Sequence, residues 1–184
     1  MTDRADIQND LAPSQDAGRR RQMLVSIGVI LAVACLLGYG YYLQYVEYLD
    51  PCPLCMTQRL FYYLIALFAA LAFFRVASIG WQKLTGTLLA LSAAGGLLVA
   101  LRQIWLQHLP PEEVPECGPG LEYWLANKPM FQTLQLLFKG DGNCAEVVWS
   151  FLGLSIASWS ALWFLFFLIV GLWIASCTYR LSPK

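Results

Sequence analysis

Four long apolar stretches separated by polar segments set the pattern of this chain. Each stretch approaches the roughly 20 residues that a helix needs to cross a hydrocarbon core of about 30 Å. Backbone groups in lipid must be hydrogen-bonded within their own segment, so we predict helices rather than strands. The predicted segments, in chain order, are a tail (1–22), a first span (23–43), a loop (44–55), a second span (56–75), a loop (76–83), a third span (84–102), a long loop (103–150), a fourth span (151–177) and a second tail (178–184).

The composition of the chain supports the same fold class. Of its 184 residues, 58% are hydrophobic and only 13% are charged, and the mean hydropathy is +0.54. A soluble domain of this length would need more polar surface to cover its core. We therefore predict an all-α membrane protein, a four-transmembrane-helix bundle that has the lipid bilayer as its solvent. The formal net charge is +0, and no basic run suggests a nucleic-acid partner.

The lysines and arginines set the orientation of the predicted bundle. The two tails and the loop 76–83, with their borders, hold eight of these residues, whereas the loops 44–55 and 103–150 with their borders hold four. Cytoplasmic loops carry the excess of basic residues in membrane proteins. Both termini are therefore predicted to be cytoplasmic, and the loops 44–55 and 103–150 are predicted to lie on the outer face.

The first span could also be interpreted as a cleaved signal peptide. Arg19, Arg20 and Arg21 precede an apolar run, as they would in such a signal. However, the apolar character continues to Tyr42 and beyond, which is too far for an ordinary signal peptide. We therefore predict a retained helix. Residues 1–22, with scattered charges and few large apolar side chains, are predicted to be a disordered cytoplasmic tail.

Six cysteines are distributed unevenly over this topology. Cys35 and Cys177 fall inside apolar spans, and we interpret them as small buried apolar residues. An outer, oxidising face favours disulfide chemistry over free thiols. The remaining cysteines all fall on that face and are the candidate redox residues: Cys52, Cys55, Cys117 and Cys144.

A C-x-x-C motif, Cys52 to Cys55, lies at the start of the second span. Cysteines at a helix N-terminus face unpaired N–H groups and the positive end of the helix dipole, which favour the thiolate that attacks and leaves in exchange. Arg59 follows Cys55 by four residues and so shares its helix face. We interpret its guanidinium as a group that stabilises the Cys55 thiolate and polarises an electron acceptor. The alternative is an interfacial anchor that reaches the membrane surface.

The long loop 103–150 carries the second cysteine pair, Cys117 and Cys144. Proline and glycine interrupt the loop repeatedly, but the apolar spacing of Met130–Phe138 predicts a short amphipathic helix on the membrane surface. A disulfide between Cys117 and Cys144 could exchange with the C-x-x-C, or it could be a structural link worth about 3–4 kcal/mol. Zinc bound by the four cysteines is a further alternative. The wide separation of the second pair argues against zinc.

Together these features resemble the DsbB family of bacterial disulfide-generating membrane enzymes. The resemblance covers roughly residues 23–175 and depends on the four spans, the C-x-x-C followed four residues later by arginine, and the long outer loop with two cysteines. The cysteine topology and the segment Phe151–Leu154 are specific in combination. The matching motifs also include Leu106-Gln107-His108, Gly142-Asn143-Cys144-Ala145-Glu146 and Trp149-Ser150-Phe151-Leu152-Gly153-Leu154.

The resemblance implies a protein-disulfide:quinone oxidoreductase of the bacterial cell inner membrane, with its catalytic cysteines facing the periplasm. By that resemblance, Cys117–Cys144 oxidises a DsbA-like periplasmic thiol oxidase through a mixed disulfide at Cys117. Cys52–Cys55 then reoxidises this pair. Cys55, beside Arg59, passes the electrons to ubiquinone or menaquinone, which is the implied cofactor.

Two other interpretations compete with this one. A reductase of the vitamin K epoxide reductase type shares four helices and quinone chemistry, but its loop pair precedes the C-x-x-C, whereas Cys117 and Cys144 follow it here. A non-enzymatic membrane scaffold would use both cysteine pairs as structural disulfides. His108 is the only histidine and lies just past the third span. It is a candidate hydrogen-bond donor or proton relay for a quinone, with an interfacial polar residue as the alternative.

Overall fold

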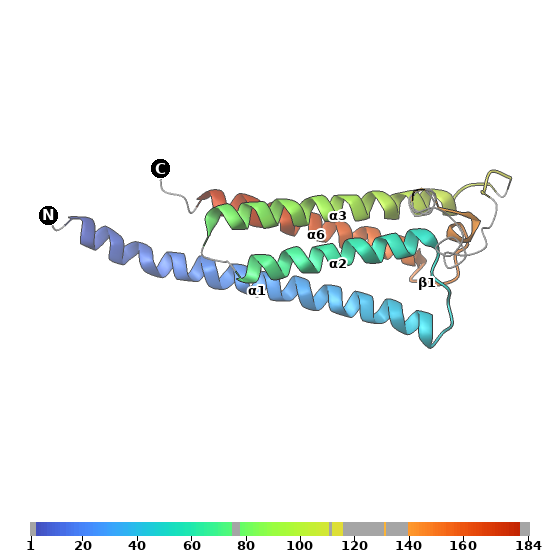
Figure 1. Cartoon of the computed structure of the whole chain (residues 1–184), viewed down its shortest axis with the longest axis horizontal. Coiled ribbons are helices and arrows are strands. Elements are labelled where there is room, and N and C mark those ends of the chain that lie inside the picture. Colours follow the sequence, from blue (N-terminus) through green and yellow to red (C-terminus); the bar gives the residue numbers. More distant parts are fainter. Residues whose placement is uncertain (1–2, 75–77, 111, 116–130, 132–139, 181–184) are drawn as a thin grey trace.

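The computed structural model describes residues 3–74, 78–110, 112–115, 131 and 140–180. Within this part of the chain, four long helices form an elongated bundle, with both termini at one end (Figure 1). Each helix contains a segment long and apolar enough to cross a membrane. The protein is therefore a multi-pass membrane protein with the predicted four-helix architecture. The helices are α1 (Asp3–Tyr45), α2 (Pro53–Phe74), α3 (Ile79–Gln107) and α6 (Ile156–Arg180).

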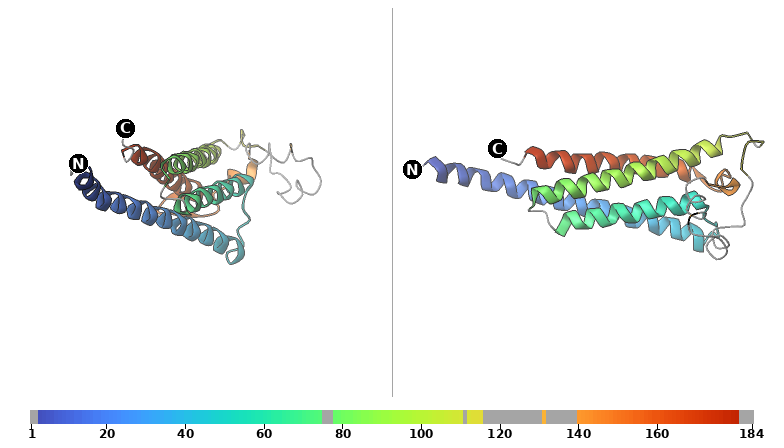
Figure 2. Two further views of the ribbon diagram at one scale, coloured as in Figure 1. Left: turned by 60° about the vertical axis from the view of Figure 1, so that its left-hand side comes forward. Right: turned by 45° about the horizontal axis from the view of Figure 1, so that its top comes forward.

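The helices pack around an aromatic and aliphatic core. α3 packs along both α2 and α6, while α1 packs mainly on α2 (Figures 1 and 2). Tyr62 of α2 stacks on Phe164 of α6 with 4.4 Å between ring centroids. Large apolar side chains also cover the outside of the bundle, for example Leu31, Leu91 and Leu98, each at least 60% exposed. Such a surface is suited to lipid rather than water.

Two glycines allow α3 and α6 to approach closely. A Cβ atom on Gly86 would lie 2.8 Å from the backbone nitrogen of Ala175, and one on Gly171 would lie 2.8 Å from the backbone nitrogen of Ala90. Neither backbone can move aside as a flexible side chain would. Small residues at helix contacts are the usual way in which membrane helices gain van der Waals packing, so these two positions fix the distance between α3 and α6.

The fourth span starts later than predicted. Strands β1 (Ser150–Phe151) and β2 (Leu154–Ser155) form an antiparallel hairpin immediately before α6. Its two central residues, Leu152 and Gly153, have φ values of 53° and 79°. Positive φ at both positions is typical of a two-residue hairpin turn and is incompatible with a right-handed helix. The predicted helix start at residue 151 is therefore wrong, and α6 begins at Ile156.

The N-terminal tail also differs from the prediction. α1 begins at Asp3, so the expectation of a disordered segment over residues 1–22 is wrong. Once a membrane span has nucleated a helix, each further residue adds a hydrogen bond at little cost. The tail also contains good helix formers such as alanine, leucine, glutamine and arginine. The predicted short helix over Met130–Phe138 lies outside the described residues, apart from Phe131.

Candidate redox site

The C-x-x-C motif forms the N-terminus of α2. Pro53 is the first helical residue, where its missing N–H removes no helix hydrogen bond. The carbonyl of Cys52 accepts a hydrogen bond from the N–H of Met56 at 3.1 Å, and its Sγ accepts one from the N–H of Cys55 at 3.4 Å. Cys52 therefore acts as the N-cap of α2. The Sγ atoms of Cys52 and Cys55 lie 3.0 Å apart as free thiols, so two-electron oxidation could join them in a disulfide with only a small movement.

The end of the long loop returns to this pair through a 3-10 turn, η1 (Gly142–Cys144). Gly140 precedes the turn with φ of 76°, and a Cβ atom there would lie 2.8 Å from the side chain of Leu54. Glycine thus lets the turn lie directly against α2. The buried carboxylate of Asp141 accepts a hydrogen bond from the Cys144 thiol at 3.7 Å. These contacts fix Cys144, which is fully buried.

Cys144 and Cys52 belong to one buried cluster, against which Cys55 packs. Cys52 precedes the membrane-spanning segment of α2. A hydrogen bond with the Cys144 thiol, another with the Cys55 thiol, and burial all raise the pKa of Cys52 above its usual range. Cys52 therefore lies between the other two sulfurs as a protonated thiol. Cys117 lies outside the described residues, so its position relative to Cys144 stays a prediction.

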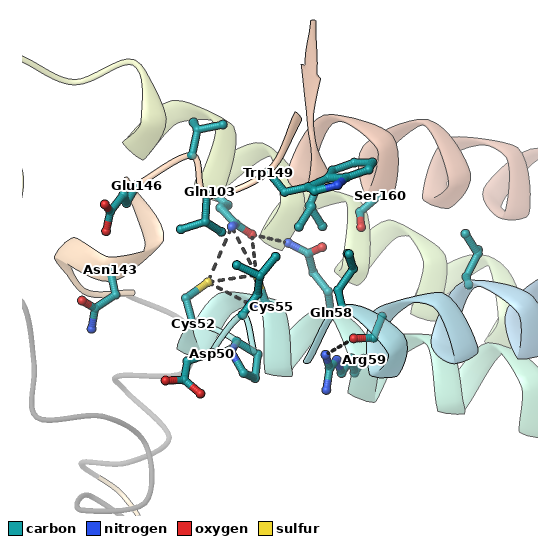
Figure 3. A pocket seen from close by; sticks show the side chains of 18 of the residues that line it. Asp50, Cys52, Cys55, Gln58, Arg59, Gln103, Asn143, Glu146, Trp149 and Ser160 are labelled. Atoms are coloured by element: carbon teal, nitrogen blue, oxygen red, sulfur yellow. Dashed lines mark hydrogen bonds between the residues drawn. The ribbon is translucent and has the colours of Figure 1, made fainter. Parts of the chain in front are cut away.

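Two buried glutamines that were not selected from the sequence lie near the cysteine pair, and one of them, Gln103, contacts the sulfurs (Figure 3). The Nε2 atom of Gln103, on α3, lies 3.3 Å from the Sγ of Cys55 and 3.5 Å from the Sγ of Cys52. The Nε2 atom of Gln58, on α2, donates to the Oε1 of Gln103 at 2.7 Å. Gln58 and Gln103 are 45 residues apart, and no motif links them. Only the packing of α2 on α3 brings them together.

Arg59 lies beside the cysteine pair but directs its hydrogen bonds to α1. Its guanidinium donates to the Oε1 of Gln44 at 2.6 Å and to the carbonyl of Gly40 at 3.1 Å. It also lies over the ring of Tyr41, 4.9 Å from the centroid. Arg59 thus joins α2 to α1. It also lines a cavity that Cys55 lines. The sequence indicated its helix face but not these partners.

A cavity of about 140 Å³ brings three of the predicted residues together. Cys52, Cys55 and Arg59 line it, together with Gln58 and Gln103 (Figure 3). It adjoins a more apolar groove of about 370 Å³ between α1 and α6. The two share several lining residues, and aromatic rings dominate the groove: Tyr39, Tyr62, Trp149, Phe151, Trp159 and Trp163.

His108 is not among the residues that line this cavity. It is exposed at the C-terminus of α3, where its Nδ1 lies 2.8 Å from the carbonyl oxygen of Ile104. Because a carbonyl can only accept, this nitrogen carries the proton. Cys35, interpreted from the sequence as buried, is exposed on the outside of α1, because its side chain faces away from the other helices.

A membrane-spanning bundle that gathers three thiols at one end of its helices defines a class, the membrane thiol–disulfide oxidoreductases. The family described as "Disulfide bond formation protein DsbB" matches residues 21–174. The chain belongs to this family, and its role is in disulfide bond formation.

Relatives in several bacteria support this assignment. A "Disulfide bond formation protein B" of Marinobacter nauticus is 44% identical over 156 residues, which cover 85% of this chain and 92% of that protein. One of Hahella chejuensis is 46% identical over 145 residues, covering 76% and 85%. One of Methylococcus capsulatus is 47% identical over 138 residues, covering 73% and 82%.

Proposed function

We propose that the protein reoxidises a DsbA-like periplasmic thiol oxidase and passes the electrons to ubiquinone or menaquinone in the bacterial inner membrane. The observation that carries the proposal is the position of Cys52. It contacts Cys144, the end of the long loop, on one side and Cys55, in the cavity, on the other. Electrons that arrive at the loop cysteines therefore have a short route to Cys55.

The proposed exchange balances in four steps. One thiol of the DsbA-like dithiol attacks Cys117, so a mixed disulfide forms and Cys144 leaves as a thiolate. The second thiol of that partner then breaks the mixed disulfide, so the partner leaves oxidised and Cys117 is freed as a thiolate. The Cys144 thiolate attacks the Sγ of Cys52, so a Cys144–Cys52 bond forms, the Cys52–Cys55 bond breaks and Cys55 leaves as a thiolate. Cys117 then attacks Cys144 and releases Cys52. The loop disulfide is restored, and Cys52 and Cys55 hold two electrons as a dithiol.

The lining of the cavity and groove fits a quinone. Quinones combine a polar ring with an apolar prenyl tail, and here a polar cavity adjoins an aromatic groove. Arg59 would hold a ring oxygen beside Cys55, and the groove between α1 and α6 would take the tail. A bound quinone would supply a two-electron, two-proton acceptor. The arginine, already tied to Gln44 and Gly40, needs little reordering for that role.

The test is anaerobic mixing of the purified protein with reduced DsbA and a soluble quinone analogue, with quinone absorbance as the readout. We expect Cys55→Ser to abolish quinone reduction and Arg59→Met to lower its rate at least tenfold, since the charge-assisted hydrogen bond proposed between Arg59 and the quinone oxygen is lost. Two matched controls should keep the wild-type rate. Cys35→Ser removes an exposed thiol of α1, and Arg102→Met removes an arginine that lies over Trp105 at 4.4 Å.

Full activity of Cys55→Ser would refute the electron route. If the cysteines of this protein stay fully oxidised in cells depleted of quinone, the protein is instead a scaffold with structural disulfides. The thiol state is read by alkylation in cells. If Arg59→Met reduces the quinone analogue at the wild-type rate, Arg59 has no role in quinone reduction and serves only to link α2 to α1.

A further inference from the structure

The amide nitrogen of Gln103 faces the two sulfurs, whereas its oxygen faces Gln58 and also lies 3.7 Å from the Cys55 Sγ, as an acceptor for that thiol in the reduced protein. Its Oε1 is 2.7 Å from the Nε2 of Gln58, and its Nε2 is 3.3 Å from Cys55 and 3.5 Å from Cys52 (Figure 3). Gln58 and Gln103 are only 3% and 4% exposed. The low exposure of both amides makes each hydrogen bond stronger than it would be at the surface.

The Gln58 contact determines which way the Gln103 amide faces. The Nε2 of Gln58 can only donate, so the atom of Gln103 that meets it must be the accepting Oε1. The two N–H groups of Gln103 are consequently directed to the cysteine side. A donor aimed at sulfur stabilises the thiolate over the thiol. Cys55 receives the shorter of the two contacts.

The two cysteines of the motif therefore have different neighbours. Cys52 contacts the thiols of Cys144 and Cys55, and its Sγ also accepts from the N–H of Cys55 and, in the longer of the two amide contacts, from Gln103. Cys55 faces the amide N–H of Gln103 and the cavity. The arrangement suits one direction of exchange, in which Cys52 is the sulfur under attack and Cys55 is the sulfur that leaves with the electron pair.

We infer that Gln103 is a catalytic residue whose amide N–H stabilises Cys55 as the leaving thiolate when the Cys52–Cys55 disulfide opens, and that Gln58 is the positioning residue that holds this amide in orientation. The inference deepens the proposed function and rests on it for the direction of exchange. The bond between the sulfurs of Cys52 and Cys55 breaks, the attacking thiolate joins Cys52, and Cys55 keeps the electron pair.

The first experiment measures thiol reactivity in the full-length reduced protein, without DsbA or quinone. Iodoacetamide alkylation of Cys55 is followed at several pH values by peptide-mapping mass spectrometry. We expect Gln103→Met, which keeps the volume but removes the donor, to slow Cys55 alkylation at pH 7 about tenfold. Gln82→Met is the matched control. It removes another buried glutamine of α3, whose amide donates to the carbonyl of Ala72, and should alkylate at the wild-type rate.

A second variant tests the orientation itself. In Gln58→Glu, a protonated carboxyl can still donate to the Oε1 of Gln103, whereas a carboxylate can only accept. Ionisation should therefore turn the amide and present its oxygen to the sulfurs. The measured quantity is the rate of Cys55 alkylation in the variant divided by the rate in the wild type. We expect this ratio to be near one at low pH and to fall severalfold as the pH rises through the titration of the introduced carboxyl. Loss of packing alone would not make the ratio depend on pH in this way.

The outcomes separate the inference from the function on which it rests. Wild-type Cys55 alkylation in Gln103→Met, an equal loss in Gln82→Met, or a pH-independent ratio in Gln58→Glu would each overturn the inference. If Gln103→Met does not fold, the Gln58→Glu ratio alone decides. If wild-type protein fails to reduce a quinone analogue with reduced DsbA, the proposed function fails, whatever the alkylation rates are.

Discussion

At the scale of single residues, Cys52 and Cys55 are neighbours in one motif but occupy different environments. Cys52 is 9% exposed and caps the helix, whereas Cys55 is half-buried in the lining of the cavity. Both residues line the cavity, and Cys52 in addition has a hydrogen bond with Cys144 at the end of the loop. A linear motif describes the spacing of the two thiols but not this difference.

Alkylation of the reduced protein should distinguish the two thiols. Because its neighbours and burial raise the pKa of Cys52, its reactive thiolate stays scarce until the pH exceeds that raised value. We expect iodoacetamide at pH 7 to 8 to modify Cys55 at least tenfold faster than Cys52, as measured by peptide mapping. Equal rates would contradict this picture. The Cys144→Ala variant removes the first neighbour of Cys52 and should narrow the difference.

Residues selected from the sequence account for only part of the site. Cys52, Cys55 and Arg59 were found because spacing of three and four residues decides which side chains share a helix face. Gln58 and Gln103 were not, since their pairing depends on how α2 packs on α3. A polar residue within an apolar span is a signal of function, and Gln58 carries that signal, whereas Gln103 lies within a span only because α3 continues to Gln107. Which partner it meets is a tertiary property.

At the scale of elements, hydropathy predicted the four spans well because crossing a bilayer imposes a length on each helix. It predicted their ends poorly. The start of α6 was placed too early because Phe151, Leu152 and Leu154 are as apolar as the helix that follows, although the positive φ of Leu152 and Gly153 makes a hairpin turn. Hydropathy measures apolar character and contains no information on backbone conformation.

The close contact of α3 and α6 leads to a prediction about stability. Gly171→Val adds a β-branched side chain where even a Cβ atom would meet the backbone of Ala90. Overpacking of this kind costs roughly 1–3 kcal/mol, so the Tm should fall by about 5 °C in a protein of this size. Thermal unfolding in lipid nanodiscs would measure it. Gly28→Val is the matched control, since a Cβ atom there meets nothing within 4 Å, and a similar fall in it would contradict the prediction.

At the scale of the whole molecule, four spans place both termini at one end and the start of α2 at the other (Figure 1). The sulfur cluster belongs to this second end, because Cys52 and Cys55 lie at the start of α2. We predict that the end with the termini is cytoplasmic, because eight of the twelve lysines and arginines belong to the two tails and the loop 76–83 with their borders. A tag on the C-terminus should then resist protease added to spheroplasts. A tag inserted between Glu47 and Asp50 should be cleaved. The reverse pattern would place the sulfurs in the reducing compartment and exclude the proposed exchange.

The groove between α1 and α6 has a practical consequence for anyone who purifies the protein. Its tryptophan- and tyrosine-rich walls offer a detergent alkyl chain the same apolar contacts as the prenyl chain that we propose to lie there. A solubilised sample would therefore show an acceptor affinity that falls as the micelle concentration rises, through simple competition for the groove. Kinetic constants measured in two different surfactants would then disagree even though the sulfur chemistry is identical.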